Sequence, residues 1–444
     1  MKTKMLLLAA AAGVMLASLP SVPASCAPGA VPVKPGAAPA ARTPAHSIAT
    51  AATYKISGPF SSGNLSVYLI HGADQANAGQ YVTLQEALQA KQVVVHETGD
   101  VNELSIENKG NQLVFIQSGD IVKGGRQDRA VQFDLVLPPR SGKVPLTSFC
   151  VEQGRWSPRG KEVSTGFSSS TKQFVAKEMK LAAKMPDMTK VAMAAPRAVG
   201  ATAGGGGASY AGYGAGVGLT NGAVARTGNA LIPPPPVTLQ TDAAPTSAAA
   251  PAGAPAPVPM AYAPQLQGGM WNAVSKVQGK LERAAKKKVT SEESESSLQL
   301  TLENDAVKQK GQAHINDLSK VVAGKRDVIG YAFAINGKVN SADVYASNAL
   351  FLKLWPKLLD ATATEAVSEE AEKTASNAAP AVKDVRECLI DAERAKPVIS
   401  TTNGRTKLIT SQQTQDNKKN VLFETQTTGA AQKKLWVHRN YITK

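Results

Sequence analysis

One glycine-containing stretch holds the densest group of side chains that could bind a ligand. Residues 119–129 read GDIVKGGRQDR, so cations surround two adjacent glycines. Glycine lets a ligand approach the backbone, and successive backbone N–H groups in such a turn can bind an anion. The glycine spacing is not that of a P-loop. The stretch predicts either a polar or anionic ligand site or an ordinary hairpin connection. The candidate ligand-binding residues here are Asp120, Lys123, Gly124, Arg126, Gln127, Asp128 and Arg129.

A second stretch, FCVEQGRW, contains residues suited to nucleophilic catalysis. Cys150 and Glu152 stand two residues apart and would share one face of a strand. Arg155 could lower the pKa of the thiol, which is the condition for a nucleophile, and Arg155 and Trp156 are further candidate ligand contacts. The alternative is a buried structural cysteine.

The histidines predict no metal site, because none shows metal-ligand spacing. They are His46, His71, His96, His314 and His438. His96 stands beside Glu97, a third candidate catalytic residue, and would act as a base for the thiol only if the fold brings the two together. No cofactor is predicted.

The formal net charge of +15 predicts a basic, solvated surface. No zinc-finger spacing and no RRM-like aromatic motif accompanies it, so nucleic acid is not an expected partner. The densest basic run, residues 276–288, is followed at once by acidic residues 292–295. This pattern is typical of a solvated helix and its loop. The expected partner is instead a polar or anionic ligand or an envelope protein.

The first 24 residues predict a signal peptide of the bacterial type. Lys2 and Lys4 precede an apolar core, residues 5–19, that is too short for a membrane span. Val22-Pro23-Ala24 then offers a small-residue cleavage site. We therefore expect export to the periplasm, the cell envelope or the medium.

Cys26 raises the question of a lipid anchor. It follows the apolar core as in a lipobox, but Pro23 stands where a lipobox has an aliphatic residue. Membrane contact is expected only through the signal peptide or such an anchor. If Cys26 is acylated, Cys150 and Cys388 remain as an even pair, and an exported protein could join them in a disulfide.

Two low-complexity stretches divide the chain. Residues 25–52 are rich in Ala and Pro, and residues 196–268 in Gly, Ala and Pro. Both contain too few core-forming residues to offset the entropy of ordering, so a disordered linker and a disordered insert are expected. The remainder forms the two halves of one α+β domain, residues 53–195 and 269–444.

The N-terminal half predicts an antiparallel, sheet-rich sandwich or barrel. A helix over residues 84–91 would begin at a capping box formed by Thr83 and Glu86, and residues 171–191 favour a second helix. The expected strands are 65–70, 93–95, 104–108, 112–117, 129–137 and 144–152.

The C-terminal half predicts helices packed between strands. A hairpin of 328–335 and 339–347 would turn at Asn336-Gly337. The expected helices are 270–285, 312–322, 348–373, kinked at Pro356, and 381–395. The other expected strands are 297–304, 398–402, 406–411, 420–426 and 434–441.

The segments QSGDIVKGGRQDR and LTSFCVEQGRW resemble signatures of the ARG and Rhodanese-Phosphatase-superfamily-associated protein domain, a family without an established activity. The similarity covers about 53–193 and 270–442. The first motif of the family would fall on Asp120, Gly124, Gln127 and Arg129, the second on Cys150, Glu152, Arg155 and Trp156, and a recurring Glu on Glu97. The sequence departs from the pattern at Asp128, where Asn is commoner, at Asp120, where Glu is commoner, and in the insert.

Two functions are consistent with these patterns. The first is a non-catalytic envelope or secreted domain that binds a polar or anionic ligand or a partner protein through residues 119–129. The second is a hydrolase or transferase that uses Cys150 or the carboxylates of Asp120, Glu97 and Glu152, with Arg126, Arg129 or Arg155 holding the substrate. The first is favoured, because no triad or metal site is recognisable.

Overall fold

A computed structural model describes residues 51–75, 80–100, 102–155, 166–184, 264–370, 378–394, 397–403, 406–412, 420–428 and 434–444. Residues 49–444 form one compact unit, and residues 1–48 are a separate unit. The expected signal peptide, Cys26, Trp156 and residues 196–263 of the expected insert lie outside the described residues.

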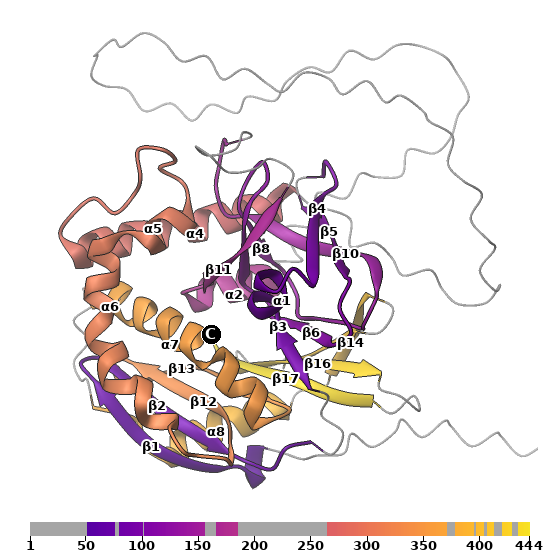
Figure 1. Cartoon of the computed structure of the whole chain (residues 1–444). Coiled ribbons are helices and arrows are strands. Elements are labelled where there is room, and N and C mark those ends of the chain that lie inside the picture. Colours follow the sequence, from indigo (N-terminus) through magenta and orange to yellow (C-terminus); the bar gives the residue numbers. More distant parts are fainter. Residues whose placement is uncertain are drawn as a thin grey trace, which may run out of the picture. The chain divides into compact units, whose positions relative to one another are not determined.

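An antiparallel main sheet of eight strands dominates the described part (Figure 1). Strands from both ends of the sequence build it, so the two halves of the chain share one sheet. In spatial order the strands are β1 (Lys55–Ser62), β2 (Leu65–His71), β12 (Val328–Ile335), β13 (Lys338–Tyr345), β17 (Lys434–Thr443), β16 (Asn420–Thr428), β15 (Thr406–Gln412) and β14 (Pro397–Asn403).

The N-terminal half adds a curled sheet of six strands, here called the half-barrel, in which β4 approaches β11. Its strands are, in order, β11 (Phe167–Gln173), β7 (Asp120–Gly124), β8 (Arg129–Val131), β10 (Gly142–Cys150), β5 (Glu103–Asn108) and β4 (Val93–Glu97). A small sheet packs beside it, with β6 (Leu113–Ile116) between β3 (Tyr81–Thr83) and β9 (Leu135–Leu137).

Helix α7 (Asn348–Ser368) connects these layers. It packs on β12 of the main sheet and on β11 of the half-barrel, and it runs through Pro356 without a break. The other helices are α1 (Leu84–Gln89), α2 (Lys177–Lys184), α4 (Pro264–Ala285), α5 (Leu298–Glu303), α6 (Asp305–Leu318) and α8 (Val382–Glu393). Helix α8 packs on β13, β16 and β1 of the main sheet. Short 3-10 turns cover Ala51–Thr53 and Ser319–Val322.

The expected fold class is confirmed, as are two of its local signals. Thr83 and Glu86 form the predicted capping box at α1. Asn336 and Gly337 take φ values of 50° and 72° between β12 and β13, as the predicted hairpin turn requires.

The predicted strand 297–304 is wrong, because these residues form α5. Its alternating leucines match a strand, but Ser297 caps a helix by accepting from the Leu300 N–H at 3.2 Å. Gln299 and Thr301, which a strand would expose to solvent, are buried. The side chain of Gln299 also donates to Glu303 one helical turn later, at 2.8 Å.

Several predicted boundaries are also wrong: helix α4 begins at Pro264, inside the expected insert of 196–268, and α7 ends at Ser368 rather than at 373. Residues 129–137 form β8 and β9 in different sheets, because the chain bends at Phe133. Residues 171–173 belong to β11, and helix α2 begins only at Lys177. Helix α6 begins at Asp305, well before the expected residue 312, because Asn304 caps it.

A buried ion triad joins the N-terminal half to the main sheet. His438 on β17 lies 2.7 Å from Asp134 through Nδ1 and 3.0 Å from Asp343 on β13 through Nε2. Burial alone would lower the pKa of His438, but the two carboxylates raise it. Burial would raise the pKa of each aspartate, yet His438 and Lys184 hold both below their usual range. The triad therefore holds an imidazolium between two carboxylates.

The triad predicts a window of maximum stability. The stabilisation from Asp134 and Asp343 is fully present above the ordinary aspartate pKa of 3.8. It is lost as the pH falls through the lowered pKa values of the two side chains. The histidine contribution of the triad is present below the ordinary pKa of 6.5 and is lost as pH rises through the raised value. The free energy of unfolding, measured by urea titration, should therefore peak between these values.

Substitution of His438→Asn should remove that peak and lower the free energy of unfolding by about 3–5 kcal/mol, because it leaves two buried carboxylates without their cationic partner. His71→Asn is the matched control. His71 pairs with Asp327, whose side chain is 62% exposed, so its loss should cost at most about 1 kcal/mol. Equal effects of the two substitutions would contradict a special role for the triad.

Candidate functional site

The turn between β7 and β8 requires its two glycines. Gly124 and Gly125 have φ values of 115° and 57°, a region that favours glycine. A Cβ on Gly125 would lie 2.4 Å from Oε1 of Glu97, and one on Gly124 would lie 2.6 Å from the Gly166 carbonyl oxygen. The turn therefore packs directly against Glu97 at the end of β4.

The backbone donors of this turn are used by the protein itself. The N–H of Gly124 donates to Asp128 Oδ1 at 3.0 Å, and that of Gly125 to the Gly166 carbonyl at 3.1 Å. The N–H of Arg126 donates to Glu97 Oε1 at 2.9 Å. Any anion site at this turn must therefore rely on side chains rather than on a free backbone nest.

Arg129 is the most unusual side chain of the site. It lies between Val122 of β7 and Cys150 of β10 in the strand register, and only 1% of it is exposed. Its Nη1 donates to Gln127 Oε1 at 3.2 Å. In the described part of the chain, Arg129 forms no ion pair, and its Nε has no hydrogen-bond partner. A buried guanidinium without a carboxylate is costly, and its retention calls for an explanation.

Glu152 lies just beyond Cys150 and is fully buried. Its Oε2 accepts from Arg155 Nε at 2.7 Å, while Oε1 has no hydrogen-bond partner among the described residues. Arg155 also lies 3.8 Å from Asp128, between its Nη2 and Oδ1. The cluster thus contains a donor, Nε of Arg129, and an acceptor, Oε1 of Glu152, that the described protein leaves unused.

The Cys150 thiol is poorly suited to nucleophilic attack. Burial raises its pKa to about 11 against the opposing effect of Arg129, and Glu97 and Glu152 raise it further. The Cys150 backbone is fixed by Gln267, which accepts from its N–H at 3.0 Å and donates to its carbonyl at 2.8 Å. The candidate base His96 has its Nε2 3.6 Å from Oε2 of Glu107, so its ring faces a carboxylate.

The fold gathers most of the predicted site residues but not all of them. Glu97, the 124–129 turn, Cys150, Glu152 and Arg155 meet at one end of the half-barrel, here called the mouth. Asp120 lies at the other end of β7, where it binds Lys357 at 2.9 Å. Lys123 forms an ion pair with Glu303 of α5, with 2.7 Å between Nζ and Oε1. Trp156 lies outside the described residues.

The chain matches the family model of the ARG and Rhodanese-Phosphatase-superfamily-associated Protein domain, ARPP-1, over residues 53–196 and 259–441. These ranges cover well over half of the chain. The chain belongs to this family. No curated protein and no solved structure matches it. The two parts of the ARPP-1 match flank the stretch 197–258 and include the mouth, the triad and the main sheet.

Sequence reasoning missed the polar face of the ARPP-1 main sheet. Besides the triad, this face holds Asn440, which donates to Asp343 at 2.8 Å and accepts from Lys184 at 3.1 Å. Glu365 of α7, whose pKa burial raises, accepts from Asn340 at 2.8 Å. The signal that could have revealed this face was the presence of charged residues within apolar strands, Asp343 in β13 and His438 in β17.

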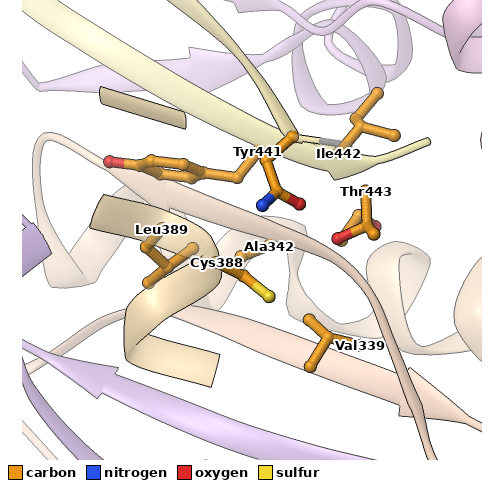
Figure 2. Close-up of a pocket in the computed structure, with 9 residues that line it drawn as sticks. Val339, Ala342, Cys388, Leu389, Tyr441, Ile442 and Thr443 are labelled. Carbon is orange, nitrogen blue, oxygen red and sulfur yellow. The ribbon is translucent and has the colours of Figure 1, made fainter. Parts of the chain in front are cut away.

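A small pocket lies away from the mouth, between α8 and the ends of β13, β16 and β17. Figure 2 shows Cys388, Val339 and Thr443 around it. None of the predicted site residues lines it. In the described part of the chain, Cys388 and Cys150 are not joined in a disulfide.

The described residues contain no cluster of His, Cys, Asp and Glu side chains arranged to hold a metal ion. Among the helices of the described ranges, none is long and apolar enough to cross a membrane.

The raised pKa of Cys150 in this ARPP-1 chain predicts slow alkylation. Labelling of the folded protein with iodoacetamide at pH 8 should be roughly two orders of magnitude slower at Cys150 than at a free thiol, because so little thiolate is present. Peptide mass spectrometry separates this site from Cys26 and Cys388, and urea should restore the rate. A labelling transition at or below pH 8 would support the nucleophile instead.

Proposed function

We propose that this chain is an exported, non-catalytic domain that binds a small ligand carrying an anionic group at the mouth of the half-barrel. The buried Arg129 guanidinium, which forms no ion pair within the described residues, is the observation that supports this proposal. A ligand carboxylate or phosphate would supply the missing counter-charge through charge-assisted hydrogen bonds.

A comparison within the molecule supports a ligand role for Arg129. Arg439, which is also buried, donates to Glu424 Oε2 at 2.7 Å and to the Tyr54 hydroxyl at 3.0 Å. An arginine that serves only the fold is expected to be paired in this way, because an uncompensated buried charge destabilises the protein. Arg129 has only an amide oxygen as its partner in the described part of the chain.

Glu152 adds to the expected chemistry of the ligand. Its unused Oε1 is an acceptor, so a ligand group beside it should donate a hydrogen bond. The ligand would then carry an anionic group for Arg129 and a hydroxyl or amine for Glu152. Arg126, which is exposed at the rim, would attract the anion toward the mouth.

The catalytic alternative has less support. The raised pKa of Cys150 keeps the thiol protonated near neutral pH. Glu97 accepts from the backbone of Arg126, and Glu152 and Asp128 lie beside Arg155, so these carboxylates already have structural roles. Binding without reaction therefore fits the mouth better.

Substitution of Arg129→Met tests the proposal, with Arg439→Met as the matched control. Arg129→Met should keep or raise the melting temperature, because it removes an unpaired buried charge, and should abolish stabilisation by inorganic phosphate. Arg439→Met should lower stability by about 3–5 kcal/mol, because Glu424 loses its partner, but should keep the phosphate effect. Differential scanning calorimetry with and without phosphate measures both.

Two outcomes would contradict the proposal. If Arg129→Met destabilises the protein as strongly as Arg439→Met, then Arg129 is structural. If phosphate stabilises the wild type and Arg129→Met equally, the anion binds elsewhere. A ligand at one hundred times its Kd should add about 2.7 kcal/mol of stability, which calorimetry resolves easily.

Export rests on the N-terminal sequence and has its own test. Expressed in a bacterium, the full chain should be recovered outside the cytoplasm without residues 1–24, and mass spectrometry should place the new terminus at Ser25. Cys26→Ser should leave this product unchanged if the protein is free. A lipid adduct on Cys26 would show anchoring instead, and an intact N-terminus on a cytoplasmic product would contradict export.

A further inference from the structure

We infer that the side chains of Lys184 and Asn440 join in an intramolecular isopeptide bond, with release of ammonia. Lys184 ends α2 in the N-terminal half, and Asn440 lies on β17 of the main sheet. The Nζ of Lys184 already lies 3.1 Å from the side-chain oxygen of Asn440. These elements are not those of the mouth, so the inference does not depend on the proposed anion site.

The Asn440 amide is held with its carbonyl group toward the lysine. Its Nδ2 donates to Asp343 Oδ1 at 2.8 Å and to the Ala342 carbonyl at 3.4 Å. An ionised carboxylate and a carbonyl only accept, so these contacts fix the amide nitrogen on their side and the oxygen on the side of Lys184. The amine therefore needs to move only from the oxygen to the carbon of the same carbonyl group. Asn440 is 1% exposed, so water has little access to this carbon.

The surroundings of Lys184 increase the share of the neutral amine, which is the nucleophilic form. Burial lowers the pKa of its ammonium group, Asp134 and Asp343 oppose this shift, and Lys180 adds to it. The Nζ also lies 5.1 Å from the centre of the buried Phe423 ring. A lysine that lies between an aromatic ring and an amide loses its proton more readily than one in water.

Asp343 is placed to transfer the proton that the reaction requires. Its side chain is buried, and its Oδ1 accepts from the Asn440 amide nitrogen. Its Oδ2 has no hydrogen-bond partner among the described residues. His438, whose Nε2 lies 3.0 Å from the same Oδ1, stabilises the carboxylate before it accepts a proton. A buried carboxylate oxygen normally has a partner, so an unused one beside this amide is available as a general base.

The atoms of the step balance without any further reactant. The neutral Lys184 amine attacks Cγ of Asn440, the new C–N bond forms, and the electron pair of the C=O bond moves to Oδ1. The attacking nitrogen gives one proton to the Asp343 carboxylate, which returns a proton to Nδ2 of the amide. When the carbonyl re-forms, the bond between Cγ and Nδ2 breaks and ammonia leaves. The product is a secondary amide that covalently links α2 to β17.

Peptide mass spectrometry of the full chain tests the inference. The protein is denatured, reduced and digested with trypsin, which does not cleave after a lysine whose amine is acylated. The wild type should yield a branched peptide of residues 181–190 and 440–444. Its mass should equal that of the two linear peptides less one ammonia.

Two conservative variants test whether Lys184 is the residue that reacts. Lys184→Arg keeps the positive charge but cannot form the bond, so it should yield linear peptides only. Lys180→Arg is the matched control, because Lys180 lies one helical turn earlier and packs over the Phe333 ring. This control should keep the branched peptide. Slow alkylation of Cys150 shows that each variant is folded.

Asp343→Asn tests the transfer of the proton. The variant should slow formation of the branched peptide roughly a hundredfold, because it removes the general base. The ratio of branched to linear peptides at successive times after synthesis measures this rate. An unchanged rate in folded Asp343→Asn would overturn the role assigned to Asp343.

The isopeptide bond itself is overturned if the wild type yields only linear peptides at their full masses. It is also overturned if Lys184→Arg still yields a peptide joined to Asn440. Arg129→Met should leave the branched peptide unchanged, so failure at the mouth and failure at this bond are distinguishable.

Discussion

The structure depends on a charged contact where an apolar one would ordinarily be expected. His438 lies between Asp134 and Asp343, and all three side chains are almost completely buried. Asp134 stands between β8 and β9 of the N-terminal half, while its two partners belong to the main sheet. Removing one partner of such a group is costly, because the remaining charge stays buried. The triad therefore specifies how the halves join, and the surrounding apolar contacts supply the bulk of the stability.

Helix α7 extends this junction. One of its faces packs on the main sheet through Phe351 and Trp355, both of which contact Tyr331 of β12. Its polar contacts continue toward the half-barrel, where Lys357 pairs with Asp120 and Asp360 with Lys172. A single helix thus carries an apolar interface on one side and ion pairs on the other. This arrangement explains why the two parts of the ARPP-1 match, which a long insert separates, form one compact unit.

The local parts of the fold were predictable because their signals are local. The capping box at Thr83 and the turn at Asn336-Gly337 each depend on a few adjacent residues. The failures occurred where tertiary contacts override the pattern. Alternating leucines in α5 matched a strand, but buried contacts of Gln299 and Thr301 stabilise a helix. For the site, the sequence identified the residues of the mouth, but it could not show that Asp120 and Lys123 bind Lys357 and Glu303 instead.

Charged residues at a glycine turn suggest a solvent-exposed loop, but in the structure most polar groups of this turn already have partners within the protein. Lys123 and Arg155 are paired with carboxylates of the chain, and the backbone donors of the turn are occupied. A cation that already has a partner gains little from a second anion, because the first pair must be weakened to form the second. Any affinity for an anion must therefore come from a cation without such a partner in the described part. Arg126 and Arg129 both meet that condition, but only Arg129 is buried, so a ligand at the site proposed there would have to be small enough to enter the half-barrel.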